Sequence, residues 1–190
     1  MKKLLTSVLC MALTLSFAAA ATTAQFVDDF SMSRSKMVSS ENITINDSQP
    51  AGGLGPKRTG QTTCIARMTK ADTGSIVYKV DGVVTGVSAD LYYAIFKGST
   101  VNEGYKLIVS GSVDGSNFTE IESVAFADPK HVGYAAGEIP GKQTPEIVVN
   151  KSKKYRYVKI ALHSTTQNSK GEVMYLPFLL ESVYIDYIAK

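Results

Sequence analysis

The stretch YKLIVSGSVDGSNFTEIESV, residues 105–124, has the pattern of two β-strands joined by a short polar turn. Asp114-Gly115 occupies the turn, and this pair accepts the positive φ that tight hairpin turns require. Phe118 and Ile121 supply apolar anchors for the returning strand. The stretch therefore predicts an antiparallel β-hairpin.

Apolar and polar residues alternate with a period of two through much of the remaining chain. Between residues 87 and 95, Val87, Ala89 and Leu91 fall on one face, and Ser88 and Asp90 on the other. Further strands are predicted at 42–46, 62–68, 76–80, 145–150, 157–162 and 181–189, all rich in the Val, Ile, Tyr and Thr that strands favour.

Turn and loop sequences separate these runs. Asp81-Gly82, Pro140-Gly141 and residues 168–171 are turn sequences, and residues 49–60 and 127–145 have the composition of long loops. No amphipathic helical pattern of useful length follows the N-terminal segment. The chain is therefore predicted to be all-β, an antiparallel two-sheet β-sandwich (jelly roll) in a single domain.

The first 24 residues have the sequence of a signal peptide. A positive start, MKK, precedes the apolar run LLTSVLCMALTLSF, and alanines follow at 18–21. This order predicts cleavage between Ala20 and Ala24 and a mature domain of residues 25–190, secreted to the extracellular space or the cell envelope. No later apolar run is long enough to cross a bilayer, so no membrane span is expected in the mature protein.

Charge and cysteine content narrow the possible partners. The chain has 20 Lys and Arg against 17 Asp and Glu, and loss of Lys2 and Lys3 with the signal peptide leaves 18 against 17. This balance gives no sign of a nucleic-acid-binding face, so no nucleic-acid partner is expected. Cys64 is the one cysteine after the signal peptide, and it is predicted to be a small buried residue rather than a nucleophile.

The hairpin also carries a family resemblance. Its pattern S-x-D-G-x-x-F-x-E-I, residues 112–121, resembles the hairpin of galactose-binding-like jelly rolls, the discoidin-type domains and bacterial carbohydrate-binding modules. KYRYVKIAL, residues 154–162, resembles the strand that follows their long loop, and ESVYIDYIAK, residues 181–190, resembles their closing strand. FVDDFS, residues 26–31, is similar to the start of such modules on secreted glycoside-active enzymes. The resemblance implies a jelly roll of this type.

The same resemblance implies a non-catalytic module that binds a carbohydrate or cell-wall glycan. Aromatic rings stack on sugars in such modules, but this chain has no Trp, so Tyr would have to serve. Tyr105, Tyr134 and Tyr175 lie in or near turns and are the candidates for exposure. His131 shares the long loop 127–145 with Tyr134, and such rim loops commonly carry binding sites. These four residues are the predicted ligand contacts; the competing interpretation is that the loop is only a polar surface crossover.

The resemblance further implies a structural Ca²⁺ where the two terminal strands run side by side. Asp28 and Asp29 near the mature N-terminus and Asp186 near the C-terminus are the predicted carboxylate ligands, and Glu181 or Asp47 would add another. Calcium is held by such carboxylates together with backbone carbonyls. The competing interpretation is that Asp28-Asp29 caps a turn and that Asp186 faces solvent.

No catalytic motif accompanies these features. His131 and His163 lack the spacing of a zinc site, and no G-x-S-x-G sequence occurs. The chain is therefore predicted not to be an enzyme. The alternative to a glycan-binding module is an extracellular structural or adhesion protein that binds other proteins or a cell-surface component through a sandwich face or edge. The lack of Trp favours this alternative.

Overall fold

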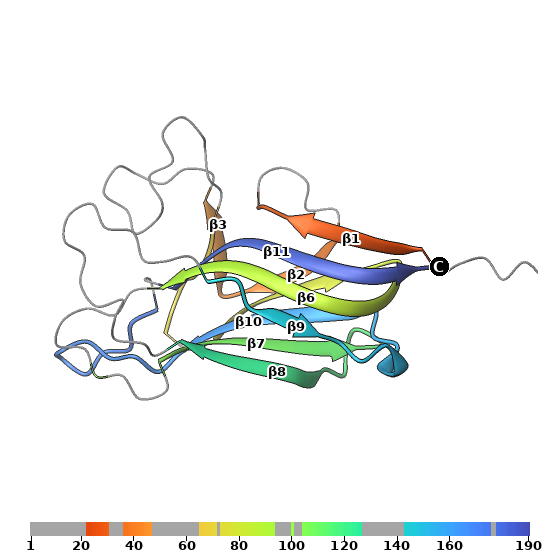
Figure 1. Ribbon diagram of the computed structural model, residues 1–190. Coiled ribbons are helices and arrows are strands. Elements are labelled where there is room, and N and C mark those ends of the chain that lie inside the picture. The colour runs from red at the N-terminus through yellow and green to blue at the C-terminus, as the bar shows by residue number, and fades with distance from the viewer. Residues whose placement is uncertain are drawn as a thin grey trace, which may run out of the picture.

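The computed structural model describes residues 22–30, 36–46, 65–71, 73–93, 100, 104–126, 143–175 and 178–190. These residues form eleven strands in two antiparallel sheets that pack face to face (Figure 1). The predicted all-β, two-sheet sandwich is confirmed. No helix in the described part of the chain is long and apolar enough to cross a membrane.

The first sheet has six strands: β3 (Ile43–Asn46), β4 (Ile65–Met68), β11 (Phe178–Ala189), β6 (Gly82–Tyr93), β9 (Glu146–Val148) and β1 (Thr23–Asp28). The long strands β6 and β11 pair along the middle of this sheet. β11 pairs on its other side with β4 near its start and with β1 over the rest. Strands from both ends of the chain therefore lie side by side.

The second sheet has five strands, in the order β2 (Met37–Glu41), β5 (Thr73–Lys79), β10 (Tyr157–Ser164), β7 (Tyr105–Ser112) and β8 (Thr119–Phe126). A short 3₁₀ turn, η2 (Lys151–Lys153), lies between β9 and β10. The side chain of Asn150 caps this turn, because its Oδ1 accepts a hydrogen bond from the backbone N–H of Ser152 at 3.0 Å.

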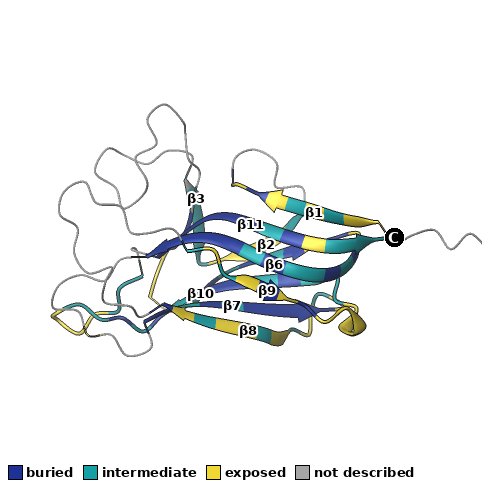
Figure 2. Cartoon of the chain, viewed as in Figure 1, coloured by how far each residue is buried: buried dark blue, intermediate teal, exposed yellow. Residues whose placement is uncertain are grey.

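The core lies between the two sheets and follows the period of two (Figure 2). Val87, Ala89 and Leu91 of β6, which the sequence places on one face, are all buried. Buried side chains of β7 and β10, among them Leu107 and Ile160, belong to the same apolar cluster. The alternation seen in the sequence is therefore the division between the core and the outside of the sandwich.

The predicted hairpin is formed by β7 and β8, and Asp114 organises its turn. The Oδ1 atom of Asp114 accepts hydrogen bonds from the backbone N–H groups of Asn117 and Ser116, at 2.9 and 2.8 Å, and from the hydroxyl of Ser112 at 2.8 Å. These donors stabilise the ionised carboxylate and hold the pKa of Asp114 well below its usual range. Gly115 follows with a φ of 82°, so the turn needs the glycine that the sequence provides.

The first strand begins within the interval predicted for signal-peptide cleavage. β1 starts at Thr23, and Thr23 and Ala24 both pair with β11. A mature domain that started at residue 25 would lack these two strand residues. Residues 1–21 lie outside the described part of the chain, so cleavage of a signal peptide stays a prediction.

Candidate functional site

Tyr105 is not an exposed ligand contact. It is the first residue of β7 and is fully buried, with its ring centroid 5.2 Å from that of Phe178 and 5.8 Å from that of Tyr93. It shares the inward face of β7 with Leu107 and Val109, because side chains two residues apart point the same way. The prediction that a tyrosine beside a turn is exposed is therefore wrong at this position.

The other predicted ligand contacts have different outcomes. Tyr175 is partly buried and packs against the core. Tyr134, His131 and Cys64 lie outside the described residues, and the predictions made for them stay predictions. Because Tyr105 is in the core, it cannot join Tyr134 and Tyr175 in an exposed ligand-binding surface.

The terminal strands do run side by side, but the three predicted metal ligands do not converge. Asp28 is paired with Val183 and is buried on the core side, whereas Asp186 is exposed on the opposite side of the sheet and is paired with Gln25. Three residues along β1 separate these two pairs, a distance of about 10 Å. Among the described residues, no group of three or more His, Cys, Asp or Glu side chains is suitably placed for a metal ion. The predicted grouping of Asp28, Asp29 and Asp186 is therefore wrong, and calcium binding elsewhere stays untested.

Asp28 has a structural role instead. Its Oδ2 accepts a hydrogen bond from the hydroxyl of Tyr78 in β5 at 3.0 Å, and its Oδ1 accepts one from the backbone N–H of Phe30 at 2.8 Å. The first bond links the six-stranded sheet to the five-stranded sheet through the core. Glu181, the suggested additional ligand, is also buried and accepts a hydrogen bond from Tyr92 at 3.1 Å. Asp47 lies outside the described residues.

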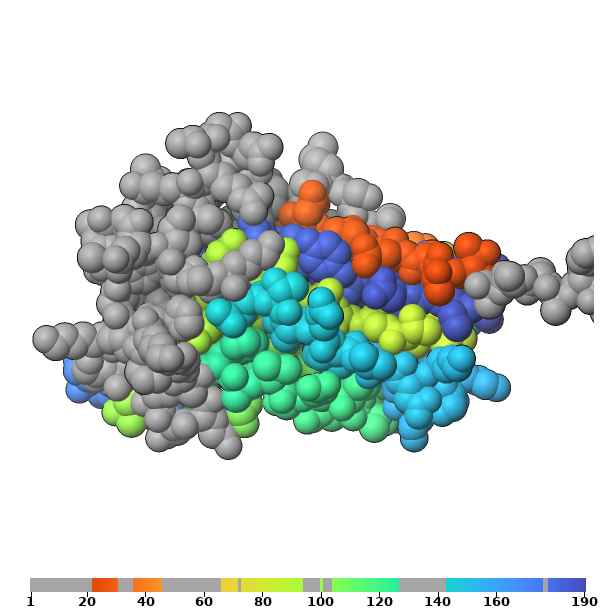
Figure 3. Space-filling model, viewed as in Figure 1, coloured from red at the N-terminus to blue at the C-terminus, as the bar shows by residue number. Residues whose placement is uncertain are grey.

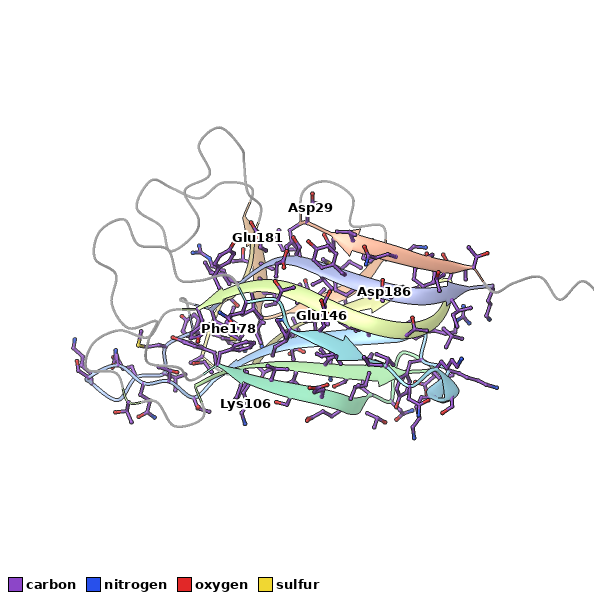
Figure 4. The ribbon with its side chains drawn as sticks, viewed as in Figure 1. Asp29, Lys106, Glu146, Phe178, Glu181 and Asp186 are labelled. Carbon is purple, nitrogen blue, oxygen red and sulfur yellow. The ribbon has the colours of Figure 1, made fainter. Side chains whose placement is uncertain are left out.

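Polar side chains gather on the outside of the six-stranded sheet, away from the core. The strands that carry them lie side by side in Figure 3, and Figure 4 labels Asp186 and Glu146 among them. We call this part of the sheet surface the outer sheet face. It includes Gly86 and Val148 beside the polar side chains, and its residues are Gln25, Gly86, Ser88, Asp90, Thr144, Glu146, Val148, Tyr184 and Asp186. They occupy the strand positions that alternate with the core residues, and Thr144 precedes β9.

A buried carboxylate fixes part of the outer sheet face. Asp90 of β6 accepts a hydrogen bond at Oδ2 from the hydroxyl of Tyr184 in β11, at 2.9 Å, and one at Oδ1 from the hydroxyl of Thr144, at 2.8 Å. Because the hydroxyl proton of Thr144 is directed to Asp90, the Thr144 oxygen keeps acceptor capacity for another group. Three side chains from separate segments are therefore held in defined positions.

Gly86 lies at the centre of this face, beneath the carboxylate of Asp186. It pairs with Asp186 on one side and with Val148 on the other. A Cβ atom at this position would lie 3.1 Å from Oδ2 of Asp186, so the carboxylate leans over the glycine. The Nε2 atom of Gln25 donates a hydrogen bond to Oδ1 of Asp186 at 2.8 Å and fixes its orientation. The backbone of Gly86 is therefore covered by an oriented carboxylate, and the exposed side chain of Val148 belongs to the neighbouring strand.

Hydrogen-bond acceptors dominate this face. Asp186 and Glu146 are exposed carboxylates, and the hydroxyl of Thr144 has acceptor capacity. Such a surface suits a ligand that carries many hydrogen-bond donors.

Sequence reasoning identified Asp186 but not the rest of this face. Alternation placed Ser88 and Asp90 away from the core, but it does not distinguish a solvent-exposed surface without a ligand from a binding surface. Gly86 was the available signal, since a glycine inside a strand pattern indicates a bulge or a close approach. A register shift does lie beside it, between Asp186 and Tyr187 on the paired strand. Such irregularities are common next to functional sites.

Comparisons with known proteins give a likeness of fold. No protein-family model and no curated protein matches the sequence. The K1 cleaved adhesin domain of Lys-gingipain from Porphyromonas gingivalis W83 is similar at a TM-score of 0.50 and 12% identity, over 85% of this chain and 97% of that one. What they share is the fold. This agrees with the predicted antiparallel two-sheet β-sandwich.

Two carbohydrate-binding modules are also similar, more distantly in fold. A single-residue mutant of the family 29 module CBM29-2, complexed with mannohexaose, has a TM-score of 0.49 and 10% identity, over 88% of this chain and 92% of that one. CsCBM6-3 from Clostridium stercorarium, in complex with cellobiose, has a TM-score of 0.42 and 14% identity, over 86% and 92%.

Proposed function

We propose that this chain is a non-catalytic binding module of an exported protein and that it binds a carbohydrate on the outer sheet face. The observation that carries the proposal is the oriented carboxylate of Asp186, which lies over Gly86, together with the exposed side chain of Val148 on the next strand. A sugar presents hydroxyl donors at its edge and C–H groups on its faces. The carboxylate and the valine match these two properties.

Pre-organisation supports the same proposal. Gln25 orients Asp186, and Asp90 orients Tyr184 and Thr144, so little side-chain entropy is lost when a ligand binds. Exposed carboxylates on a flat sheet can accept hydrogen bonds from successive sugar units. An extended glycan lying across the strands, from β11 over β6 to β9, would contact Asp186, Gly86 and Glu146 in turn.

A second candidate function is contact with another protein, as expected of an adhesion protein. The observation in its favour is that two valines on the outside of the same sheet are exposed, Val148 at 85% and Val27 at 44%. Exposed apolar groups with a polar surround are typical of protein interfaces. In that case Val148→Asp would abolish attachment to the partner, whereas Asp186→Ala would weaken it only slightly.

A glycan array and a pull-down on insoluble polysaccharides, both with residues 22–190, test the proposal. Starting at residue 22 keeps the whole of β1. We expect saturable binding that Asp186→Ala weakens at least tenfold, because a ligand donor then loses a charged acceptor. Glu120→Ala, which removes an exposed carboxylate from β8 in the other sheet, is the matched control and should bind like the unaltered protein.

The loop variant Tyr134→Ala tests whether glycan binding uses the long loop instead of the outer sheet face. If Tyr134→Ala abolishes binding and Asp186→Ala does not, the module binds glycan but uses the loop predicted from the sequence. If no glycan is retained by the unaltered, folded protein, carbohydrate binding is refuted and the protein-contact function takes its place.

A further inference from the structure

One end of the sandwich is strongly basic. It contains the residue before β2, the turn after β5, the tip of the β7–β8 hairpin, η2 and the end of β11, which backbone hydrogen bonds hold together. We call it the basic end; its basic residues are Lys36, Lys79, Lys151, Lys153, Lys154, Arg156 and Lys190. Asp81, Asp114 and the terminal carboxylate are the acidic groups there. Figure 1 shows η2, the C-terminus and the start of β1 at this same end.

This concentration is unusual for a chain with nearly balanced charge. After the predicted loss of the signal peptide the chain has 18 basic and 17 acidic residues. Removing the seven basic and two acidic residues of the basic end leaves eleven against fifteen. The rest of the molecule is therefore acidic, and the outer sheet face with Asp186 and Glu146 is part of it.

The two acidic side chains at the basic end already have partners within the protein. Asp81 forms an ion pair with Lys36, which lowers the pKa of its carboxyl. The carboxylate of Asp114 is surrounded by the donors of its own turn. Lys151, Lys153 and Lys154 are exposed, and within the described part of the chain none of them has an ion-pair partner. Their positive charge is available to an external anion.

Two further features at this end favour a lipid surface. The carbonyl of Thr22 accepts a hydrogen bond from the backbone N–H of Ala189, so the predicted signal peptide joins the sandwich here. During export this end is therefore the part of the domain nearest to the bilayer. Val113, at the hairpin tip, is 55% exposed and gives an apolar group among the lysines.

Two tyrosines at this end, Tyr155 and Tyr157, are unsuited to stacking on nucleic-acid bases. Single-stranded nucleic acid is bound by exposed rings on which bases stack. The ring of Tyr157 lies beneath Gly115 and has the Nζ atom of Lys79 5.5 Å from its centroid. The ring of Tyr155 packs against Gly111. Neither ring offers a free face for a base.

We propose that the basic end docks on an anionic membrane surface through the phosphate groups of its lipids. Lysines near such a surface attract phosphate headgroups additively, and the attraction falls within a Debye length. Val113 inserts at the level of the headgroups, as apolar groups of peripheral proteins do. The acidic outer sheet face lies on the broad side of the sandwich and not on the docked end, so docking does not bring it against the same surface. This inference does not depend on glycan binding.

Co-sedimentation with vesicles tests the inference. Residues 22–190 are mixed with vesicles of phosphatidylcholine alone or of equal parts phosphatidylcholine and phosphatidylglycerol. We expect binding to the anionic vesicles only, weakening as salt is added. The variant Lys151→Gln/Lys153→Gln should bind about thirtyfold more weakly. The control Lys70→Gln/Lys170→Gln removes the same charge from exposed positions at the opposite end and should bind normally.

Three outcomes would overturn the inference. The first is equal binding to both kinds of vesicle, and the second is an equal loss of binding in the two double variants. The third is retention on dextran sulfate or duplex DNA by a protein that binds no vesicles, which would make the basic end a general polyanion site. All four lysines are exposed, and a thermal melt of each variant shows that it is folded.

Discussion

The ring of Tyr157 lies directly beneath Gly115 at the tip of the β7–β8 hairpin. A Cβ atom on Gly115 would approach Cε1 of the ring to 2.9 Å and Cζ to 3.0 Å, and the residue has a φ of 82°. Both the backbone and the ring therefore require glycine. The contact joins two sequence motifs that lie far apart along the chain, the Asp-Gly turn and the KYRYVKI strand.

Gly115→Ala should destabilise the protein by about 2 kcal/mol or more. A left-handed backbone costs a non-glycine residue about 1–2 kcal/mol, and the clash with Tyr157 adds an overpacking cost. Chemical denaturation of both proteins measures the difference. In a Tyr157→Ala background the same change should cost only the backbone strain, about 1–2 kcal/mol. An equal cost in both backgrounds would show that the ring contact is unimportant.

A second prediction concerns acid stability. The backbone N–H of Asn117, then that of Ser116, hold the pKa of Asp114 below its unfolded value of about 3.9. A group whose pKa is lowered by folding contributes stability that is complete above the unfolded pKa and is lost as the pH falls toward the folded value. Asp114→Asn should therefore lower the melting temperature at neutral pH, and the difference from the unaltered protein should shrink below about pH 4.

Thermal melts from neutral pH to about pH 2 test this dependence on Asp114. Glu122→Gln removes a carboxylate from the same hairpin and serves as the control. A difference between Asp114→Asn and the unaltered protein that stays constant at all pH values would mean that the charge of Asp114 does not stabilise the turn.

The fold was predictable because its signals are local. The Asp114-Gly115 turn and the alternation around Val87 to Leu91 are sequence features that the structure uses directly. Gly111 follows the same logic, since a Cβ there would lie 2.3 Å from Cδ2 of Tyr155. Gly111 directly precedes the hairpin pattern of residues 112–121, and Tyr155 lies in KYRYVKIAL. Two of the segments that carry the family resemblance therefore pack against each other.

Features that depend on tertiary context were not predictable. β2, with the sequence MVSSE, has no alternation and is a strand because it pairs with β5. Tyr105 is close to a turn in the sequence, yet its position in β7 directs it into the core. The separation of Asp28 from Asp186 follows from the register of β1 on β11, which sequence spacing does not give. The outer sheet face was missed for the same reason, because it combines residues of four segments.

The bond between Tyr78 and Asp28 gives a third prediction. Tyr78→Phe removes the hydroxyl that donates to a carboxylate buried in the core, so we expect a loss of about 1–3 kcal/mol in the free energy of unfolding. Tyr157→Phe removes a hydroxyl at the outside of the sandwich and should cost under about 0.5 kcal/mol. Denaturant titrations of both variants measure this. A similar loss in the two would contradict a special role for the inter-sheet bond.

The last prediction separates ligand binding from stability at Gly86. The Cβ of Gly86→Ala would lie 3.1 Å from Oδ2 of Asp186, an exposed side chain that can move by a few tenths of an ångström. Alanine is also less costly than glycine in a strand interior, by about 0.5–1 kcal/mol. The variant should therefore be at least as stable as the unaltered protein, yet bind glycan more weakly because the added methyl group displaces the oriented carboxylate of Asp186. Ser75→Ala on the five-stranded sheet is the control. Unchanged glycan affinity in a stable Gly86→Ala protein would place the binding site elsewhere, whereas a selective loss would place the sugar over Gly86.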